Sequence, residues 1–146
     1  MSDIRRLDLI DLLGERHFQL RRLAEERWNK RGDLPISNSE WFLMARIDGG
    51  EPTIAEVSRQ VDITRQATHK LIRKMSEKGL VEVADDERNK KVKRVRLTEL
   101  GHECYRKNER LKLELEEKIA EAIGPDSVAA LKEILAVDWE LKNREP

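Results

Sequence analysis

The sequence of 146 residues has a single cysteine, Cys104, and only 4% aromatic residues. One cysteine excludes an internal disulfide framework and a metal site built from several thiolates. Three histidines, at positions 17, 69 and 102, lie too far apart in the sequence to indicate a cluster of metal ligands. We therefore expect neither a metal site nor a cofactor, and we interpret Cys104 as a buried, inert thiol rather than a redox switch.

Long apolar runs and catalytic motifs are also missing. No segment has the roughly 20 consecutive apolar residues that a membrane-spanning helix needs, and the charged first twenty residues differ from a secretion signal. The sequence lacks a glycine-rich phosphate loop and a Gly-x-Ser-x-Gly nucleophile motif. We expect a cytoplasmic protein that is not an enzyme and does not bind a membrane.

Charge, by contrast, is abundant, and it is unevenly distributed. The whole chain has 29 basic and 29 acidic residues, yet residues 64–98 hold eleven Lys or Arg and five Asp or Glu. This stretch therefore carries a net charge of +6 and the rest of the chain −6. Such asymmetry is typical of a basic surface on an acidic body, although charge alone is equally compatible with an ordinary solvated face.

Apolar periodicity predicts that most of the chain is helical. Residues from about 3 to 30 have an apolar stripe at spacings of three and four, which indicates a long amphipathic helix. Ser37 and Glu40 form a capping-box pattern that predicts the start of a second helix. Thr53 and Glu56 repeat this pattern before a short third helix.

The next segment predicts a helix-turn-helix. After the short helix, Val61-Asp62-Ile63 is a tight connection, and Thr64 is the expected cap of a longer helix that ends at Gly79. This spacing is that of a helix-turn-helix, whose second helix enters the major groove of DNA. We expect Ala67, Leu71, Ile72 and Met75 to face inward on this second helix.

The periodicity then changes from helix to strand. Val81 and Val83 alternate with polar residues, as do Val95 and Leu97, which predicts a β-hairpin with a long polar loop. A polar hairpin directly after a recognition helix is the wing of a winged helix. The fold class is therefore mainly α (α+β): a winged helix-turn-helix with a small β-hairpin, flanked by long helices at both ends.

Two further helices are expected after the hairpin. Thr98 is the predicted cap of the first, Gly124-Pro125 breaks it, and Asp126 or Ser127 would cap the last, whose apolar face includes Trp139. The apolar stripes of the terminal helices are too long for a small winged-helix core to bury. They indicate a homodimer, with an intrachain three-helix bundle as the alternative.

The run from Thr53 to Gly101 resembles the core of the MarR family of bacterial transcription regulators. The similarity covers the two capped helices, the Lys-Gly-Leu-Val turn at 78–81, the hairpin, and the closing Leu-Thr-x-x-Gly at 97–101. The resemblance implies a winged-helix homodimer with residues 1–34 as an N-terminal dimerisation helix, 35–100 as the DNA-binding domain and 101–146 as C-terminal dimerisation helices, all in one cooperative unit. It also implies a repressor in the bacterial cytoplasm, associated with the nucleoid when bound to DNA.

The wing departs from the family pattern at two positions. The family usually has Asp-x-Arg there, with the Arg in the minor groove and the Asp orienting it, and the corresponding residues of this chain are Asn89 and Lys91. Lys keeps a positive charge but lacks the planar guanidinium that suits a narrow groove. We therefore expect the wing to contact DNA with weaker recognition of groove shape.

The expected partner is double-stranded DNA with a pseudo-palindromic operator. Arg65 and Gln66 are candidates for bidentate contacts with guanine and adenine, and helix N-termini are suited to phosphate. The complete set of candidate DNA contacts is Thr64, Arg65, Gln66, Thr68, His69, Lys70 and Arg73 on the recognition helix, Arg88, Asn89, Lys90, Lys91 and Lys93 in the wing, and Ser37, Ser39 and Thr53 at helix N-termini. The alternative function is a winged helix that binds only proteins.

A small anionic aromatic effector is a further candidate partner. The resemblance implies a pocket between the dimerisation helices and the winged helix. The residues that we expect to line it are His17, Trp28, Trp41, Met44 and Tyr105. For the aromatic residues the alternative is ordinary core packing, and for His17 it is a hydrogen-bonded position in the dimer interface.

Overall fold

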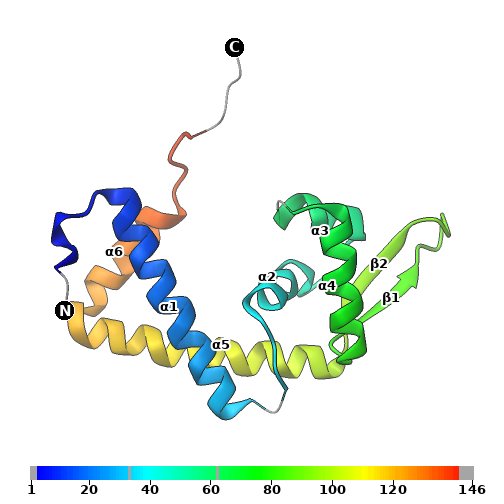
Figure 1. Cartoon of the computed structure of the whole chain (residues 1–146), viewed down its shortest axis with the longest axis horizontal. Coiled ribbons are helices and arrows are strands. Elements are labelled where there is room, and N and C mark those ends of the chain that lie inside the picture. The colour runs from blue at the N-terminus through cyan, green and yellow to red at the C-terminus, as the bar shows by residue number, and fades with distance from the viewer. Residues whose placement is uncertain (1–2, 33, 62, 142–146) are drawn as a thin grey trace. The chain divides into compact units, whose positions relative to one another are not determined.

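The computed structural model describes residues 3–32, 34–61 and 63–141. It contains helices and one antiparallel hairpin, as the sequence predicts (Figure 1). In chain order the elements are η1 (Ile4–Arg6), α1 (Leu9–Arg31), α2 (Asn38–Ile47), α3 (Ile54–Val61), α4 (Arg65–Glu77), β1 (Val81–Asp85), β2 (Lys93–Leu97), α5 (Glu99–Ile123) and α6 (Pro125–Ala136).

The start of the first long helix lies later than predicted. A short 3-10 turn, η1, comes first, and Asp8 caps α1 by accepting the Asp11 backbone N–H. Of the apolar stripe along α1, Trp28 alone is buried within the described residues. Ile10 and Phe18 are 79% and 67% exposed, whereas Leu13, Leu20 and Ala24 are half-buried.

The predicted caps of the helix-turn-helix are confirmed. Ser37 and Glu40 make both hydrogen bonds of a capping box, and Thr53 Oγ1 accepts the Glu56 N–H at 3.1 Å. Thr64 Oγ1 accepts the Ala67 N–H at 3.0 Å, which places the start of α4 where the sequence predicts it. The middle residue of the predicted turn, Asp62, lies outside the described residues.

The hairpin lies beside α4 and is held to the body at its base. Strands β1 and β2 pair in antiparallel register from Val81↔Leu97 to Asp85↔Lys93. The Val95 N–H also donates to the Pro52 carbonyl oxygen at 3.0 Å, and Thr53 forms an isolated bridge with Arg94. The segment before α3 therefore covers one edge of the hairpin, and Figure 1 shows the hairpin projecting beyond the helices α3 and α4.

One apolar core unites the winged helix with the end of α1 and the start of α5. Trp28 packs edge-on against Trp41, with 4.8 Å between ring centroids, and Cys104 and Leu111 of α5 join the same core. Gly101 allows the close approach of α5, because a Cβ there would lie 2.1 Å from the Leu80 carbonyl oxygen. This explains why the Leu-Thr-x-x-Gly pattern ends in glycine.

The chain divides into two compact units, Met1–Leu111 and Lys112–Pro146. This division falls within α5, and both the end of α1 and the start of α5 contribute to the winged-helix core. Helix α6 starts at Pro125 with Gly124 as its N-cap and no side-chain cap, so the predicted cap at Asp126 or Ser127 is wrong. Trp139 lies beyond the end of α6, not on it.

Candidate nucleic-acid interface

The exposed face of α4 carries the side chains that the sequence analysis assigns to DNA. Arg65 and Gln66 occupy its first turn, which is the end that enters the major groove in helix-turn-helix proteins. His69, Lys70 and Arg73 continue the same exposed surface along the helix. A capped helix with cationic and amide side chains at its N-terminal end is suited to hydrogen bonding with base edges.

Thr68 is the exception and corrects one prediction. Its side chain is fully buried, and its Oγ1 donates to the Thr64 carbonyl oxygen at 3.0 Å. Thr68 is therefore part of the core together with Ile72 and Met75, and it does not face DNA. Ala67 and Leu71, predicted to face inward, are only half-buried and line a hollow next to α1.

The tip of the wing is folded by its own polar side chains. Asp86 Oδ2 accepts the Arg88 backbone N–H at 3.2 Å, and Asn89 Oδ1 accepts the Lys91 backbone N–H at 3.1 Å. The Val92 N–H also donates to the Asn89 carbonyl oxygen at 2.9 Å. These bonds hold the backbone in a compact turn and leave the exposed side chains of Arg88, Lys90 and Lys91 at its surface.

An arginine links the wing tip to the body of the winged helix. Arg94 Nε donates to Asp86 Oδ1 at 2.6 Å, and its Nη1 donates to the Glu51 carbonyl oxygen at 2.8 Å. The hydrogen bond from Arg94 holds the pKa of Asp86 below its usual value, and the pKa of Arg94 is raised in turn. Lys93, predicted to contact DNA, forms an ion pair with Asp85 across the hairpin.

The helix N-termini differ in how available they are for phosphate. Ser39 is exposed in the first turn of α2, but the Ser37 hydroxyl already accepts the Glu40 N–H at 3.2 Å as part of the cap. Thr53 is half-buried at the start of α3, where its hydroxyl also caps the helix. The backbone N–H groups of these turns, rather than the cap hydroxyls, are the groups suited to a phosphate contact.

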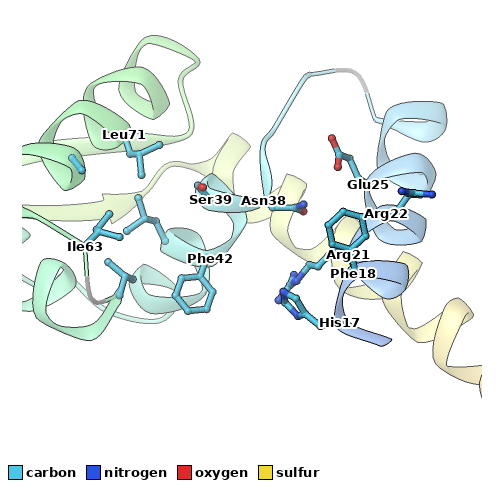
Figure 2. Close-up of a pocket in the computed structure, with 13 residues that line it drawn as sticks. His17, Phe18, Arg21, Arg22, Glu25, Asn38, Ser39, Phe42, Ile63 and Leu71 are labelled. Atoms are coloured by element: carbon cyan, nitrogen blue, oxygen red, sulfur yellow. The ribbon is translucent and has the colours of Figure 1, made fainter. Parts of the chain in front are cut away.

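A separate hollow of about 790 Å³ lies between α1 and the winged helix. Figure 2 shows Phe18 of α1 and Phe42 of α2 directed toward this space from opposite sides, with Ile63 and Leu71 on the wall formed by the winged helix. Arg22 lies over the Phe18 ring and Arg46 over the Phe42 ring, at 5.5 and 4.6 Å from the centroids. The polar residues that line the hollow are His17, Arg21, Arg22, Glu25, Asn38 and Ser39.

The hollow has different residues from those that the sequence analysis assigns to an effector pocket. His17 lines it, but Trp28, Trp41 and Met44 are buried in the core. Tyr105 packs against that core, and burial raises the pKa of its hydroxyl. The aromatic residues were misassigned because periodicity alone does not distinguish a side chain that lines a hollow from one that fills a core.

Sequence reasoning also missed Phe18, Arg21 and Phe42. A signal was present in α1, since residues 17, 18, 21 and 22 are spaced to share one helical face. The opposite wall is formed by α2, α3 and α4, and their convergence is a tertiary property that no local pattern reveals.

Comparison with known proteins identifies the fold. Residues 36–101 match the family model described as a winged helix DNA-binding domain, whereas no curated protein sequence gives a significant match. Similar solved structures include wild-type MarR from E. coli in its apo form, 20% identical with a TM-score of 0.73, covering 88% of this chain and 95% of that chain.

Two further solved structures carry ligands. The transcriptional repressor CouR bound to a 23-mer DNA duplex is 15% identical with a TM-score of 0.79, covering 93% of this chain and 96% of that chain. NadR in complex with 4-hydroxyphenylacetate is 18% identical with a TM-score of 0.70, covering 93% and 95%.

The chain is therefore a winged-helix protein with a DNA-binding domain at residues 36–101. Its fold is that of the similar MarR structure, which is the fold that the resemblance drawn from its sequence implies. Within the described residues, no helix is long and apolar enough to cross a membrane.

Proposed function

We propose that this chain is a transcriptional repressor that binds a specific duplex operator as a homodimer in the bacterial cytoplasm. The observation that carries the proposal is the exposed face of α4, where Arg65, Gln66 and His69 lie at the docking end of a capped recognition helix. The cationic wing tip adds a second contact surface on the same domain. The DNA-bound CouR structure, which has the same fold, supports this mode of binding.

The homodimer is supported by apolar surface that the protomer leaves uncovered. Helix α6 has no buried residue, and Leu131, Ile134 and Leu135 are 43–57% exposed. Such exposure of three large apolar side chains on adjacent turns of one helix is typical of an interface rather than of a solvated helix. A two-fold dimer of this kind places two recognition helices on one operator, which explains the expected pseudo-palindrome.

Salt dependence separates DNA binding from the alternative of a protein-binding module. DNA binding should weaken steeply as salt rises, because each cation bound to a phosphate releases a counterion. The Lys91→Ala variant should lower the slope of log K against log [salt] by about 0.9, the value for one lost phosphate contact. Fluorescence anisotropy with a labelled duplex at several salt concentrations measures this slope.

A matched control for this variant is Lys30→Ala in the last turn of α1, far in the sequence from α4 and the wing. Its slope should equal that of the wild-type chain. An affinity that does not change with salt would reject DNA as the partner.

The hollow beside α1 is the proposed site of an anionic aromatic effector. Phe18 and Phe42 offer two ring faces, and Arg21 and His17 offer cationic or hydrogen-bonding groups for a carboxylate. This combination of apolar walls and a few polar groups is typical of small-molecule sites. The NadR complex with 4-hydroxyphenylacetate shows that a protein of this fold binds such a compound.

An effector of this class, in excess, should weaken operator binding. Arg21→Gln should lower the affinity for a phenolic acid about tenfold, because a hydrogen bond between charged groups contributes about 1.5–3 kcal/mol, while operator affinity stays nearly unchanged. Titration calorimetry with a panel of phenolic acids, on free and DNA-bound protein, measures both. Arg16→Gln is the control, since Arg16 is on α1 but does not line this hollow.

Equal affinity of the compound for free and DNA-bound protein would contradict the proposal. A ligand shifts an equilibrium only by the difference between its affinities for the two states.

A further inference from the structure

A partly buried ion pair joins the end of the recognition helix to the first turn of α2. Lys78 is the C-cap of α4, and its Nζ donates to Glu40 Oε1 at 2.7 Å and to the Pro35 carbonyl oxygen at 2.8 Å. The same Glu40 oxygen accepts the Ser37 backbone N–H at 3.0 Å. One ammonium group therefore connects α4, α2 and the segment that follows α1.

That segment is in turn attached to α1. The Trp28 indole N–H donates to the Leu34 carbonyl oxygen at 2.7 Å, and Trp28 is itself 2% exposed. Gly32 lies so close to the indole that a Cβ there would be 2.5 Å from the ring. Lys107 of α5 also donates to the Arg31 carbonyl oxygen. The hydrogen bonds of Lys78 and Trp28 and the close packing at Gly32 therefore couple the position of Lys78 to that of α1.

The carboxylate of this ion pair lies in a buried setting. The Glu40 side chain is 2% exposed, and its Oε2 is buried with no hydrogen-bond partner among the described residues. Burial acts to raise the pKa of Glu40, but the hydrogen bonds from Lys78 and Ser37 outweigh it and hold the pKa below its usual value. Apolar side chains of similar size are often as stable as a buried ion pair, but they lack its fixed direction.

We propose that Lys78 and Glu40 are positioning residues that fix the recognition helix relative to α1. This inference rests on the proposed function, in which α1 belongs to the dimer interface. In such a dimer, the orientation of each α4 on its own α1 sets the separation of the two recognition helices. The ion pair thereby determines which half-site spacing the dimer accepts, although neither residue contacts DNA.

The same turn of α2 also adjoins the hollow. Asn38 and Ser39 line the hollow (Figure 2), and Glu40 follows them directly in the sequence as part of the capping box. A ligand in the hollow that displaces this turn would therefore also displace Glu40, which lies in the same turn of α2.

The test compares duplexes that differ only in half-site spacing. A duplex is first selected from a random pool with the wild-type chain, and one base pair is then inserted at its centre. The insertion moves one half-site by about 3.4 Å and about 34°, so we expect the wild-type affinity to fall at least about tenfold. Glu40→Gln/Lys78→Met removes both charges at similar side-chain size, and the insertion should lower its affinity less than about threefold.

Lys74→Met is the matched control, because Lys74 lies one turn earlier on α4 and forms no ion pair within the described residues. It should weaken binding to both duplexes by the same factor, which leaves the ratio of the two affinities at the wild-type value. Lys78→Arg keeps the charge and should retain spacing discrimination. If the double variant does not fold, Lys78→Gln replaces it. The ratio of its affinities for the original and the inserted duplex should then lie between the wild-type ratio and about one.

The outcomes separate this inference from the proposed function. A wild-type chain that enriches no duplex would reject the proposed function itself. A wild-type chain that discriminates spacing, together with a charge-free variant that discriminates equally well, would overturn the positioning role of the ion pair.

Discussion

A Leu131→Glu/Leu135→Glu variant should be a folded monomer whose operator affinity is reduced by more than about a hundredfold. Both side chains are exposed in the protomer, at 43% and 50%, so the substitutions leave its core intact. In the proposed dimer they would bury two charges without partners, which prevents association. A monomer engages one half-site only and loses the factor of about 10²–10⁴ that linkage of two binding modules provides.

Light scattering and circular dichroism give the mass and the helix content of this variant, and anisotropy gives its operator affinity. Val83→Glu is the control, because Val83 is 41% exposed on the hairpin, away from α6 in the sequence. The control should remain a dimer. A double variant that stays dimeric, or a wild-type chain that is monomeric with full affinity, would show that α6 does not form the interface.

Arg65→Ala/Gln66→Ala should abolish most of the specificity for the operator. Each side chain that contacts a base edge favours the correct base over a wrong one by about 1–3 kcal/mol. Loss of both side chains should therefore weaken operator binding by roughly 30-fold or more. Binding to random duplexes should weaken much less, because phosphate contacts dominate that affinity. Competition titrations with the operator and with random DNA measure the two affinities side by side.

Lys91→Ala and Arg73→Ala provide the comparison for this pair. Their side chains are proposed to contact phosphates, so each should weaken operator and random DNA by a similar factor. If all four substitutions affected the two kinds of DNA alike, α4 would not be the helix that reads the sequence.

Local signals account for the parts of the fold that were predicted correctly. Ser37 with Glu40, and Thr64 with Ala67, form caps from residues three apart, so the sequence shows where these helices start. The alternation around Val83 and Val95 likewise predicts the hairpin, whose strands pair in antiparallel register. The recognition helix and the wing, which form the candidate DNA site, could therefore be located without a structure.

Contacts between distant residues account for most of what the sequence did not reveal. One error has a local cause: Thr68 is polar but buried, because its hydroxyl donates to the Thr64 carbonyl oxygen one turn earlier. Glu40 is recognisable as half of a capping box, but its partner Lys78 lies 38 residues away. Trp28 and Trp41 have a spacing that suits a residue lining a pocket as well as a residue filling the core. Their edge-on contact places both of them in the core.

Hydroxyl-radical footprinting on a duplex selected from a random pool tests the central claim most directly. A dimer with two-fold symmetry should protect two half-sites related by an imperfect palindrome, with centres about 10 base pairs apart on one face of the DNA. The wing tips should add protection in the minor groove outside each half-site. Protection of a single asymmetric half-site, or a pool from which no duplex is enriched, would contradict the account.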